Sequence, residues 1–295
     1  MGAISVSSDF ELFCKNLRMS DTVVSNIRNR FHSITKRINQ DFWSSDSETN
    51  HSLYVGSYGR GTCIYTSDID IVVELPWSQY SKYDDYSGNG QSALLSALRN
   101  SLLKTYSSSK VSADGQVVDI SFSDGVKFEI VPAFKFDDGS YYYPDTNGGG
   151  SWKSMDPRKE IDTFNVRNSS CNGNLKRLCR MLRAWKNKNT VLMSGILLDT
   201  TVYRFLLNYE HADKSFVYYD WISRDYFKYL LEHAEQVNWE KPGNTGYVKR
   251  EYSIKADVQF AYDKSLEAIS ADSNNNTYSW HSAWRAIYGT KFPEP

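Results

Sequence analysis

The sequence lacks the features that define several common classes of protein. Its four cysteines and five histidines are scattered and form no CxxC pair, so no zinc site of the usual spacing is predicted. No run of 18 or more apolar residues is present, which excludes a conventional transmembrane helix. The segment from Met1 to Val6 has neither a basic n-region nor a long apolar h-region, so no secretory signal is seen. A cytoplasmic protein with reduced thiols is therefore expected.

An excess of positive charge is also missing. Lysine and arginine number 34 against 35 acidic residues, for a net charge of −1. Proteins that grip long nucleic acid usually carry a basic excess, because neutralised phosphates dominate that affinity. Long nucleic acid is therefore not an expected partner, although the local basic cluster at 176–188 suits one or two nucleotides. No coiled-coil seam or conspicuous apolar interface appears, so a monomer is expected.

Hydrophobic periodicity organises the first half of the chain. Apolar residues at three- and four-residue spacing predict a long helix from Ser20, its N-cap, to Phe42. Further elements follow in order: a strand at 53–55, a Gly-rich turn at 56–61, a strand at 68–75, a polar loop at 80–90 and a helix at 92–103.

A β-hairpin is predicted next, and its register has a chemical consequence. Residues 118–122 and 126–130 alternate between apolar and polar, and facing apolar on apolar pairs residues whose numbers sum to 248. This pairing places Asp119 opposite Glu129. Two facing carboxylates destabilise a sheet unless a cation or base lies between them. The register therefore hints at a metal-facing surface, and solvent exposure is the alternative explanation.

The second half of the chain is helical. A turn-rich stretch at 137–155 marks the crossing between two lobes. Helices are predicted beyond it at 173–189, 194–209, 223–235, 254–270 and 278–288. The expected fold is α+β, with an N-terminal lobe at 1–165 built on a mixed sheet with helices, including the long N-terminal helix. A helical lobe at 166–295 completes it.

Two carboxylates have the spacing of a two-metal centre. In a strand, residues two apart point to the same face, so Asp68 and Asp70 can reach one pair of ions while Ile69 points to the core. Two divalent ions about 4 Å apart stabilise both the attacking and leaving oxygens of a phosphoryl group. Mg²⁺ prefers such oxygen ligands.

The Asp-x-Asp pair follows a turn suited to phosphate. Gly56 and Ser57 close a short apolar strand, and backbone amides of a Gly-rich turn, with a serine hydroxyl, make an anion-binding nest. A third carboxylate is expected from an adjacent strand. Glu129 is the first choice, as a metal ligand that also helps to deprotonate the acceptor hydroxyl, and Asp119 is the competing acid.

These segments resemble the polymerase-β nucleotidyltransferase superfamily, and more closely its cGAS/DncV-like members (CD-NTases). The Gly-Ser and Asp-x-Asp block is typical of the whole superfamily. The narrower resemblance rests on the later segments. The matching stretches are Gly56–Thr62, Ser67–Val72, Glu129–Phe134, Leu178–Lys186 and Trp284–Pro293.

The resemblance implies a fold, a reaction and a setting. The N-terminal lobe would be polymerase-β-like with a spine helix, and the active site would lie in the cleft between the lobes. Two or three nucleoside triphosphates, ATP among them, would be joined through a linear intermediate into a cyclic di- or trinucleotide with loss of pyrophosphate. Two Mg²⁺ ions would serve, with Mn²⁺ as a substitute. In bacteria such second messengers act in antiphage (CBASS) defence, where accessory proteins are possible partners.

The resemblance also assigns residues. Asp68, Asp70 and Glu129 would hold Mg²⁺, and Gly56 and Ser57 would contact the donor triphosphate. The other nucleotide-binding residues that it implies are Arg180, Arg183, Lys186 and Ser194.

The chain departs from the family pattern at three positions. The third acid, Glu129, is Asp in many relatives. Arg183 replaces the usual triphosphate-binding Lys and adds a bidentate fork. Gly195 stands where relatives often carry a base-stacking aromatic residue. Base stacking must then come from elsewhere, and the open candidates are Tyr141, Tyr142, Tyr143, Trp152 and Tyr203.

Other functions remain as alternatives. A linear oligonucleotide synthase, an RNA-adding enzyme or a protein-modifying nucleotidyltransferase would use the same metal centre. An RNA-adding enzyme usually needs a basic platform, which is missing. An inactive nucleotide-binding module is disfavoured because the three acids and Ser57 are all retained. A protein–protein adaptor has no support in the composition.

Overall fold

The computed structural model describes residues 5–65 and 68–294. Met1–Ile4 and Ser67, which entered the sequence analysis, lie outside the described residues. Contacts divide the chain into two compact units. Unit 1 comprises residues 1–18, 60–65 and 162–295, and unit 2 comprises residues 19–59 and 66–161. The boundary at 161/162 lies close to the expected lobe boundary, while residues 1–18 and 60–65 group with the helical part.

Unit 2 is built on a mixed sheet. Its strand order is β1-β2-β5-β4-β3, and β6 pairs with β5 and β7. Strands β2 and β5 run parallel, whereas the other pairs are antiparallel. The strands are β1 (Ser52–Tyr54), β2 (Ile69–Glu74), β3 (Lys110–Asp114), β4 (Val117–Ser121), β5 (Lys127–Lys135), β6 (Tyr141–Asp145) and β7 (Ser151–Met155).

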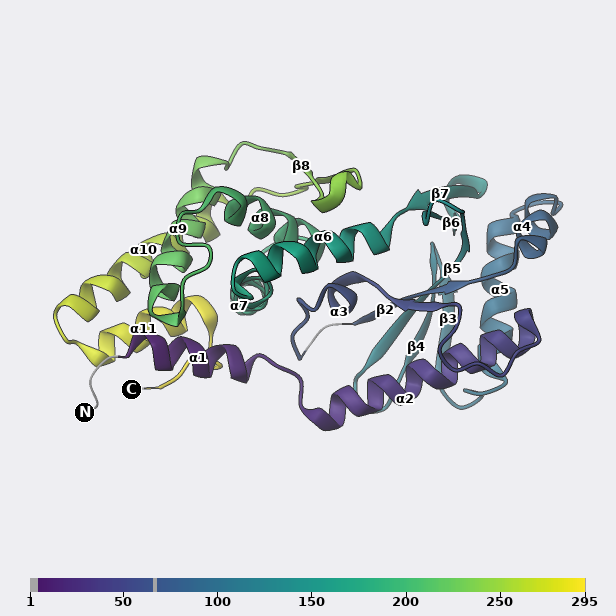
Figure 1. Cartoon of the computed structure of the whole chain (residues 1–295), viewed down its shortest axis with the longest axis horizontal. Coiled ribbons are helices and arrows are strands. Elements are labelled where there is room, and N and C mark those ends of the chain that lie inside the picture. The colour runs from purple at the N-terminus through teal and green to yellow at the C-terminus, as the bar shows by residue number, and fades with distance from the viewer. Residues whose placement is uncertain (1–4, 66–67, 295) are drawn as a thin grey trace. The chain divides into compact units, whose positions relative to one another are not determined.

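Helices of unit 2 cover one face of this sheet. Helices α2 and α5 contact each other and the sheet, and Figure 1 shows both running along it. Their apolar residues, such as Ile34 and Leu98, share one core with Ile71 and Ile130 of the central strands. The alternate residues of the strands therefore face away from this core. The helices are α2 (Asp21–Ile38), a π-helical turn (Asn39–Trp43), α3 (Gly56–Arg60), α4 (Trp77–Asp84), α5 (Gly90–Leu103) and a 3₁₀ turn (Asn147–Gly149).

Unit 1 is a helical bundle with one small hairpin. Large aromatic side chains fill its core, among them the fully buried Trp185, Trp280 and Trp284. Its helices are α1 (Val6–Asn16), α7 (Asn174–Lys188), α8 (Gly195–Asn208), α9 (Tyr219–Glu232), α10 (Lys255–Ser273) and α11 (Thr277–Tyr288). Helix α6 (Pro157–Ser170) crosses the unit boundary. Strands β8 (Asn238–Glu240) and β9 (Tyr247–Lys249) pair, and 3₁₀ turns occupy Phe216–Tyr218 and Pro242–Asn244.

The long amphipathic helices and the hairpin were predicted correctly. Ser20 caps α2 by accepting a hydrogen bond from the Val23 amide, and the 118–130 hairpin has the predicted register. The expected loop at 80–90 was wrong, because residues 77–84 form α4. Its Tyr83 is buried, and Trp77 and Tyr80 pack against each other, so aromatic burial overrides polar composition.

The stretch at 137–155 has the predicted turns, but the prediction missed its two strands. It forms the β6–β7 hairpin, and Tyr141 pairs with Met155 in its register. Turns lie at residues 137–139, where the Gly139 amide donates to the Phe136 carbonyl, and at the hairpin tip around Asn147–Gly149. The Gly-rich turn at 56–61 is largely the short helix α3, because the Gly59 amide donates to the Val55 carbonyl at 2.8 Å.

The described cysteines are all free thiols, as expected. Cys171 and Cys179 are buried, and Cys14 and Cys63 are partly exposed. No helix in the described part of the chain combines the length and apolar character that crossing a membrane requires.

A buried acid in unit 1 makes stability depend on pH. Burial, reinforced by the charge of Asp272, raises the pKa of Asp220 to about 6, although the Trp221 amide donates to its carboxylate. The unfolded chain releases this proton near pH 4. Between about pH 4 and about pH 6 the folded state therefore binds more protons, and stability falls as the pH rises through this window.

Replacing Asp220 with Asn is expected to remove this penalty. The Asn side-chain oxygen still accepts from Trp221, so the free energy of unfolding should rise by about 3 kcal/mol at pH 7.5 and change little at pH 4. Urea unfolding at both pH values measures this. Asp213→Asn is the control, since that side chain is 62% exposed. Equal gains at both pH values would contradict the assignment.

Candidate functional site

Three acidic residues lie side by side on the sheet face of unit 2 that faces away from α2 and α5. Asp70 of β2 is the register partner of Glu129 of β5, and Glu129 is the register partner of Asp119 of β4. Neighbouring strands are about 4.8 Å apart, so Glu129 is one strand from Asp70 and Asp119 is two. This order favours Glu129 over Asp119 as the third acid beside Asp70.

A lysine neutralises two of these acids. The Lys127 ammonium lies 2.6 Å from Glu129 Oε1 and 3.3 Å from Asp119 Oδ1. The hydrogen bond to Glu129 is the main reason why the pKa of Lys127 is raised. The facing carboxylates of Asp119 and Glu129 are therefore neutralised by a cation of the chain itself, Lys127.

Asp68 immediately precedes β2, and its carboxyl interacts electrostatically with Glu129, Lys127 and Asp119. Partial burial, and then the charge of Glu129, raise the pKa of Asp68 above its usual value, against the opposing effect of Lys127. A carboxylate with a raised pKa in an acidic neighbourhood gains from a bound cation.

The donor set fits a hard divalent cation. Asp68, Asp70 and Glu129 offer only carboxylate oxygens, the ligands that Mg²⁺ prefers. Within residues 5–65 and 68–294, no three acidic, His or Cys side chains already converge as a closed metal-binding group. Closing the group would require Glu129 to turn from Lys127 toward Asp70.

Gly56 brings the backbone against Asp70. Its φ is +57°, and a Cβ added there would lie 1.9 Å from Asp70 Oδ2. The Val55 amide also donates to the Asp70 carbonyl at 2.9 Å. Only glycine permits this close approach, which places Ser57 at the start of α3 beside the acidic face. The phosphate contact of Ser57 stays a prediction.

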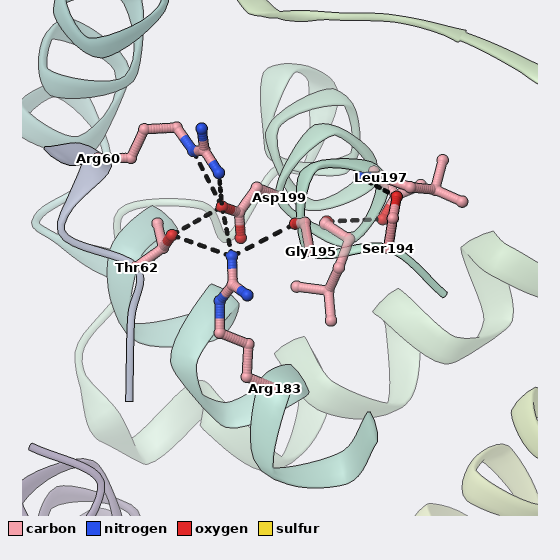
Figure 2. A network of polar contacts seen from close by, with 9 residues as sticks. Arg60, Thr62, Arg183, Ser194, Gly195, Leu197 and Asp199 are labelled. Carbon is pink, nitrogen blue, oxygen red and sulfur yellow. Dashed lines mark hydrogen bonds and ion pairs between the residues drawn. The ribbon is translucent and has the colours of Figure 1, made fainter. Parts of the chain in front are cut away.

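A buried polar network in unit 1 engages Arg183 (Figure 2). Its Nη2 donates to Asp199 Oδ2 at 2.7 Å. The Arg60 Nε and the Thr62 hydroxyl donate to the same oxygen at 3.0 and 2.7 Å. Burial alone would raise the pKa of Asp199, but Arg183 and Arg60 hold it below its usual value. Arg183 is thus first a partner of a buried carboxylate, and phosphate contact would be an additional role.

Sequence reasoning missed Asp199, Arg60 and Thr62. The available signal was weak: Asp199 is the only acidic residue in the otherwise apolar and uncharged first half of α8. A lone acid inside an apolar helix predicts a buried partner, but it does not identify which arginine supplies the charge.

Two departures from the family pattern have one physical explanation. A Cβ at Gly195 would lie 2.8 Å from Nη1 of Arg183, and Arg183 also donates to the Gly195 carbonyl at 3.3 Å. The guanidinium therefore fills the space that a side chain at position 195 would need. With Arg183 in this position, any side chain at position 195 would displace its guanidinium.

Lys186 and Ser194, both predicted from sequence, line one cavity of about 290 Å³ in unit 1. Burial, followed by the charge of Arg183, lowers the pKa of Lys186. Ser194 caps α8 by accepting from the Leu197 amide, and its side chain is exposed (Figure 2). Tyr252 and apolar residues such as Met193 also line this cavity. The Tyr252 side chain is 58% exposed.

The other residues predicted to contact nucleotide are buried or packed against neighbouring side chains. Arg180 of α7 is partly buried, and desolvation lowers its pKa. Among the stacking candidates, Tyr141 is fully buried, Trp152 packs on Tyr80, and Tyr203 packs on Phe164. None of the candidates lines the cavity beside Lys186.

Comparison with known proteins identifies related sequences. A family model described as the Second Messenger Oligonucleotide or Dinucleotide Synthetase domain matches residues 4–168. A Bacillus cereus (strain VD146) protein named "Probable cyclic nucleotide synthase" is 24% identical over 190 residues, which cover 61% of this chain and 55% of that protein. The chain thus spans about half the length of this curated relative.

Solved structures share the fold. E. coli MS115-1 CdnC, in its complex with HORMA-deltaN, matches with a TM-score of 0.69 and 14% identity, covering 97% of this chain and 98% of that chain. Vibrio cholerae DncV cyclic AMP-GMP synthase, in complex with the linear intermediate 5' pppA(3',5')pG, matches with a TM-score of 0.69 and 17% identity over 95% and 93% of the two chains. The expected α+β, polymerase-β-like fold is confirmed.

Proposed function

Because the chain belongs to the Second Messenger Oligonucleotide or Dinucleotide Synthetase family, we propose that it joins two or three nucleoside triphosphates into a cyclic oligonucleotide. The observation that carries the proposal is the acidic sheet face. Asp70 and Glu129 stand in register on parallel strands, and Asp68 precedes the first of them. Gly56 holds the Ser57 turn directly against Asp70.

The chemistry is a nucleotidyl transfer. A ribose hydroxyl oxygen attacks the α-phosphorus of a second triphosphate, the new P–O bond replaces the α–β linkage, and pyrophosphate leaves. A second transfer of the same kind closes a cyclic dinucleotide, and a cyclic trinucleotide takes three transfers, each with loss of one pyrophosphate. Glu129 accepts the hydroxyl proton. Asp68, Asp70 and Glu129 would hold Mg²⁺, with Mn²⁺ as a substitute, which supplies electrostatic stabilisation of the charge that develops at the α-phosphate.

Unit 1 would bind the nucleotide through the cavity beside Ser194. Lys186 offers an ammonium and Ser194 a hydroxyl for phosphate, while the exposed ring of Tyr252 and the apolar walls suit a base. Tyr252 thus takes over the base contact that Gly195 cannot make.

Replacing Tyr252 with Ala is expected to raise KM for nucleoside triphosphate about tenfold with a smaller change in kcat, since stacking on one base contributes about 1–3 kcal/mol. Tyr252→Trp should retain the affinity. Tyr247→Ala is the matched control, because Tyr247 lies in β9, five residues before Tyr252, is 72% exposed and does not line the cavity. Steady-state kinetics measure the difference, and equal effects of both alanine variants would refute the role.

Partners and setting follow the family. The substrates are nucleoside triphosphates, with ATP among them, and the product serves as a second messenger in antiphage defence. A monomer in the cytoplasm, open to an accessory protein, is the proposed working form. The HORMA-bound CdnC structure is one relative with such a partner.

One assay tests the proposal. Purified protein is incubated with four labelled triphosphates and Mg²⁺ or Mn²⁺, with and without accessory proteins, and the products are treated with phosphatase and resolved. A phosphatase-resistant product supports cyclisation. A phosphatase-sensitive ladder indicates linear synthesis, and absence of triphosphate consumption under every condition indicates an inactive nucleotide-binding module.

A further inference from the structure

A second cavity in unit 1 is lined by positive charge. Its volume is about 330 Å³, and its lining includes Lys188, Arg285 and Lys291 together with Tyr65. Among the residues that the structure describes, no acidic side chain lines it. The cavity shares no lining residue with the one beside Ser194, and none of its residues has a role in the proposed nucleotidyl transfer.

The cations are held in place by the surrounding chain. The Lys291 ammonium lies 4.7 Å from the ring centroid of Tyr65. The Lys188 stem packs on Gly289, where an added Cβ would lie 3.5 Å from its carbons. Gly289 has φ +81° and ψ −167°, a backbone conformation that is essentially restricted to glycine. The Arg285 Nη1 donates to the Phe292 carbonyl at 2.8 Å.

Helix ends explain only part of this charge. Helices α7 and α11 end at Lys188 and Tyr288, and each carboxyl end carries about half a negative charge. The three cations of the cavity therefore carry about two positive charges more than the two helix ends neutralise. Among the described residues, Lys188 and Lys291 have no carboxylate within ion-pair distance.

The carboxylate of Glu294 forms an ion pair with one of the cations, Arg285. It lies 3.0 Å from Arg285 Nη2, and the Glu294 side chain is 77% exposed. An exposed pair of this kind contributes little stability, so a stronger anion can displace it.

We propose that this basic cavity binds an oligophosphate anion, free or carried by a small molecule, and that Glu294 competes for the same place. The volume lies within the range of small-molecule sites, about 300–1,000 Å³, and it is too small for a macromolecular surface. Several phosphates match the two lysines, which have no carboxylate partner in the described part of the chain, and Arg285, whose partner Glu294 is exposed. The inference does not depend on the synthase activity.

Calorimetric titration of the full chain with tripolyphosphate, ATP and adenosine, in EDTA and about 0.15 M salt, tests the site. Tripolyphosphate should bind, and the double variant Lys188→Ala/Lys291→Ala should weaken it at least tenfold. Glu294→Gln should strengthen it two- to fivefold. Lys228→Ala/Lys255→Ala is the matched control, because it removes the same charge from exposed positions of the same unit.

Several outcomes would overturn the proposal. Absence of tripolyphosphate binding to the unmodified chain is one, and equal weakening in the control pair is another. Loss of binding in Lys186→Ala alone would assign the anion to the other cavity.

The comparison of ligands distinguishes the two sources of the oligophosphate. Stronger binding of ATP than of tripolyphosphate would identify a nucleotide as the ligand, whereas equal binding identifies the phosphates alone. The Asp68→Asn/Asp70→Asn variant should bind normally, so failure here is distinct from failure of the proposed synthase.

Discussion

Replacing Asp68 or Asp70 with Asn is expected to lower nucleotide incorporation by about a thousandfold. Each substitution removes a carboxylate from the proposed Mg²⁺ site, and a loss of about 4 kcal/mol of transition-state stabilisation corresponds to this factor. The fold should not suffer at Asp68, because desolvation and then the charge of Glu129 raise the pKa of this carboxyl, so neutralising it removes an unfavourable charge. Turnover of labelled triphosphate, measured beside the thermal unfolding midpoint, separates the two effects.

The two candidates for the third acid are distinguished in the same assay. Glu129→Gln should lose activity as severely as Asp70→Asn, because Glu129 is the register partner of Asp70. Asp119→Asn, one strand further away, is the matched control and should lose less than about tenfold. If Asp119→Asn proves the more damaging change, Asp119 is the third ligand. Activity of Asp68→Asn/Asp70→Asn at the unmodified level would refute the metal site.

Replacing Asp199 with Asn should destabilise the protein by about 3–5 kcal/mol. The substitution leaves Arg60 and Arg183, which are 5% and 8% exposed, without their shared counter-charge in a buried setting. A loss of this size corresponds to a drop in the unfolding midpoint of about 10 °C. Glu267→Gln, which breaks a pair that is 57% exposed on the glutamate side, is the control and should cost less than about 1 kcal/mol.

A combined replacement separates the structural role of Arg183 from a role in phosphate binding. Replacing Arg60 and Arg183 with Met and Asp199 with Leu removes all the buried charges together, and such exchanges are often neutral in stability. If the stable triple variant still binds triphosphate with unchanged affinity, Arg183 has no part in binding. A loss of affinity with normal stability would support the contact predicted from sequence.

For the single variant Asp199→Asn, a loss of less than about 1 kcal/mol in stability would contradict the expected destabilisation and show that water compensates the two guanidinium groups.

Local patterns were sufficient where one face of an element is buried. Alternation of apolar residues set the register of the 118–130 hairpin, and hence the pairing of Asp119 with Glu129, because a shift by one residue would expose the core face. The same alternation placed Asp70 on the face opposite Ile71. Patterning failed at α4 and at the β6–β7 hairpin, where tyrosine and tryptophan residues lie among polar ones and only packing shows that they are buried.

Local sequence patterns were sufficient to propose the acidic centre that follows Gly56 and Ser57. Its residue types, their spacing of two within a strand and the hairpin register are all local properties, and local properties are written in sequence order. A third carboxylate was expected from an adjacent strand, and the parallel pairing of β2 with β5, which the sequence did not predict, puts Glu129 beside Asp70.

The surroundings of Arg183 in α7, by contrast, depend on packing between segments that are distant in the sequence. Thr62 and Asp199 are 137 positions apart and 2.7 Å from each other, so no local pattern could pair them. Burial forces each charge to find a partner, and which partner it finds depends on how distant segments pack. That packing turned Arg183 toward Asp199, excluded a side chain at Gly195, and brought Tyr252 to the cavity beside Ser194.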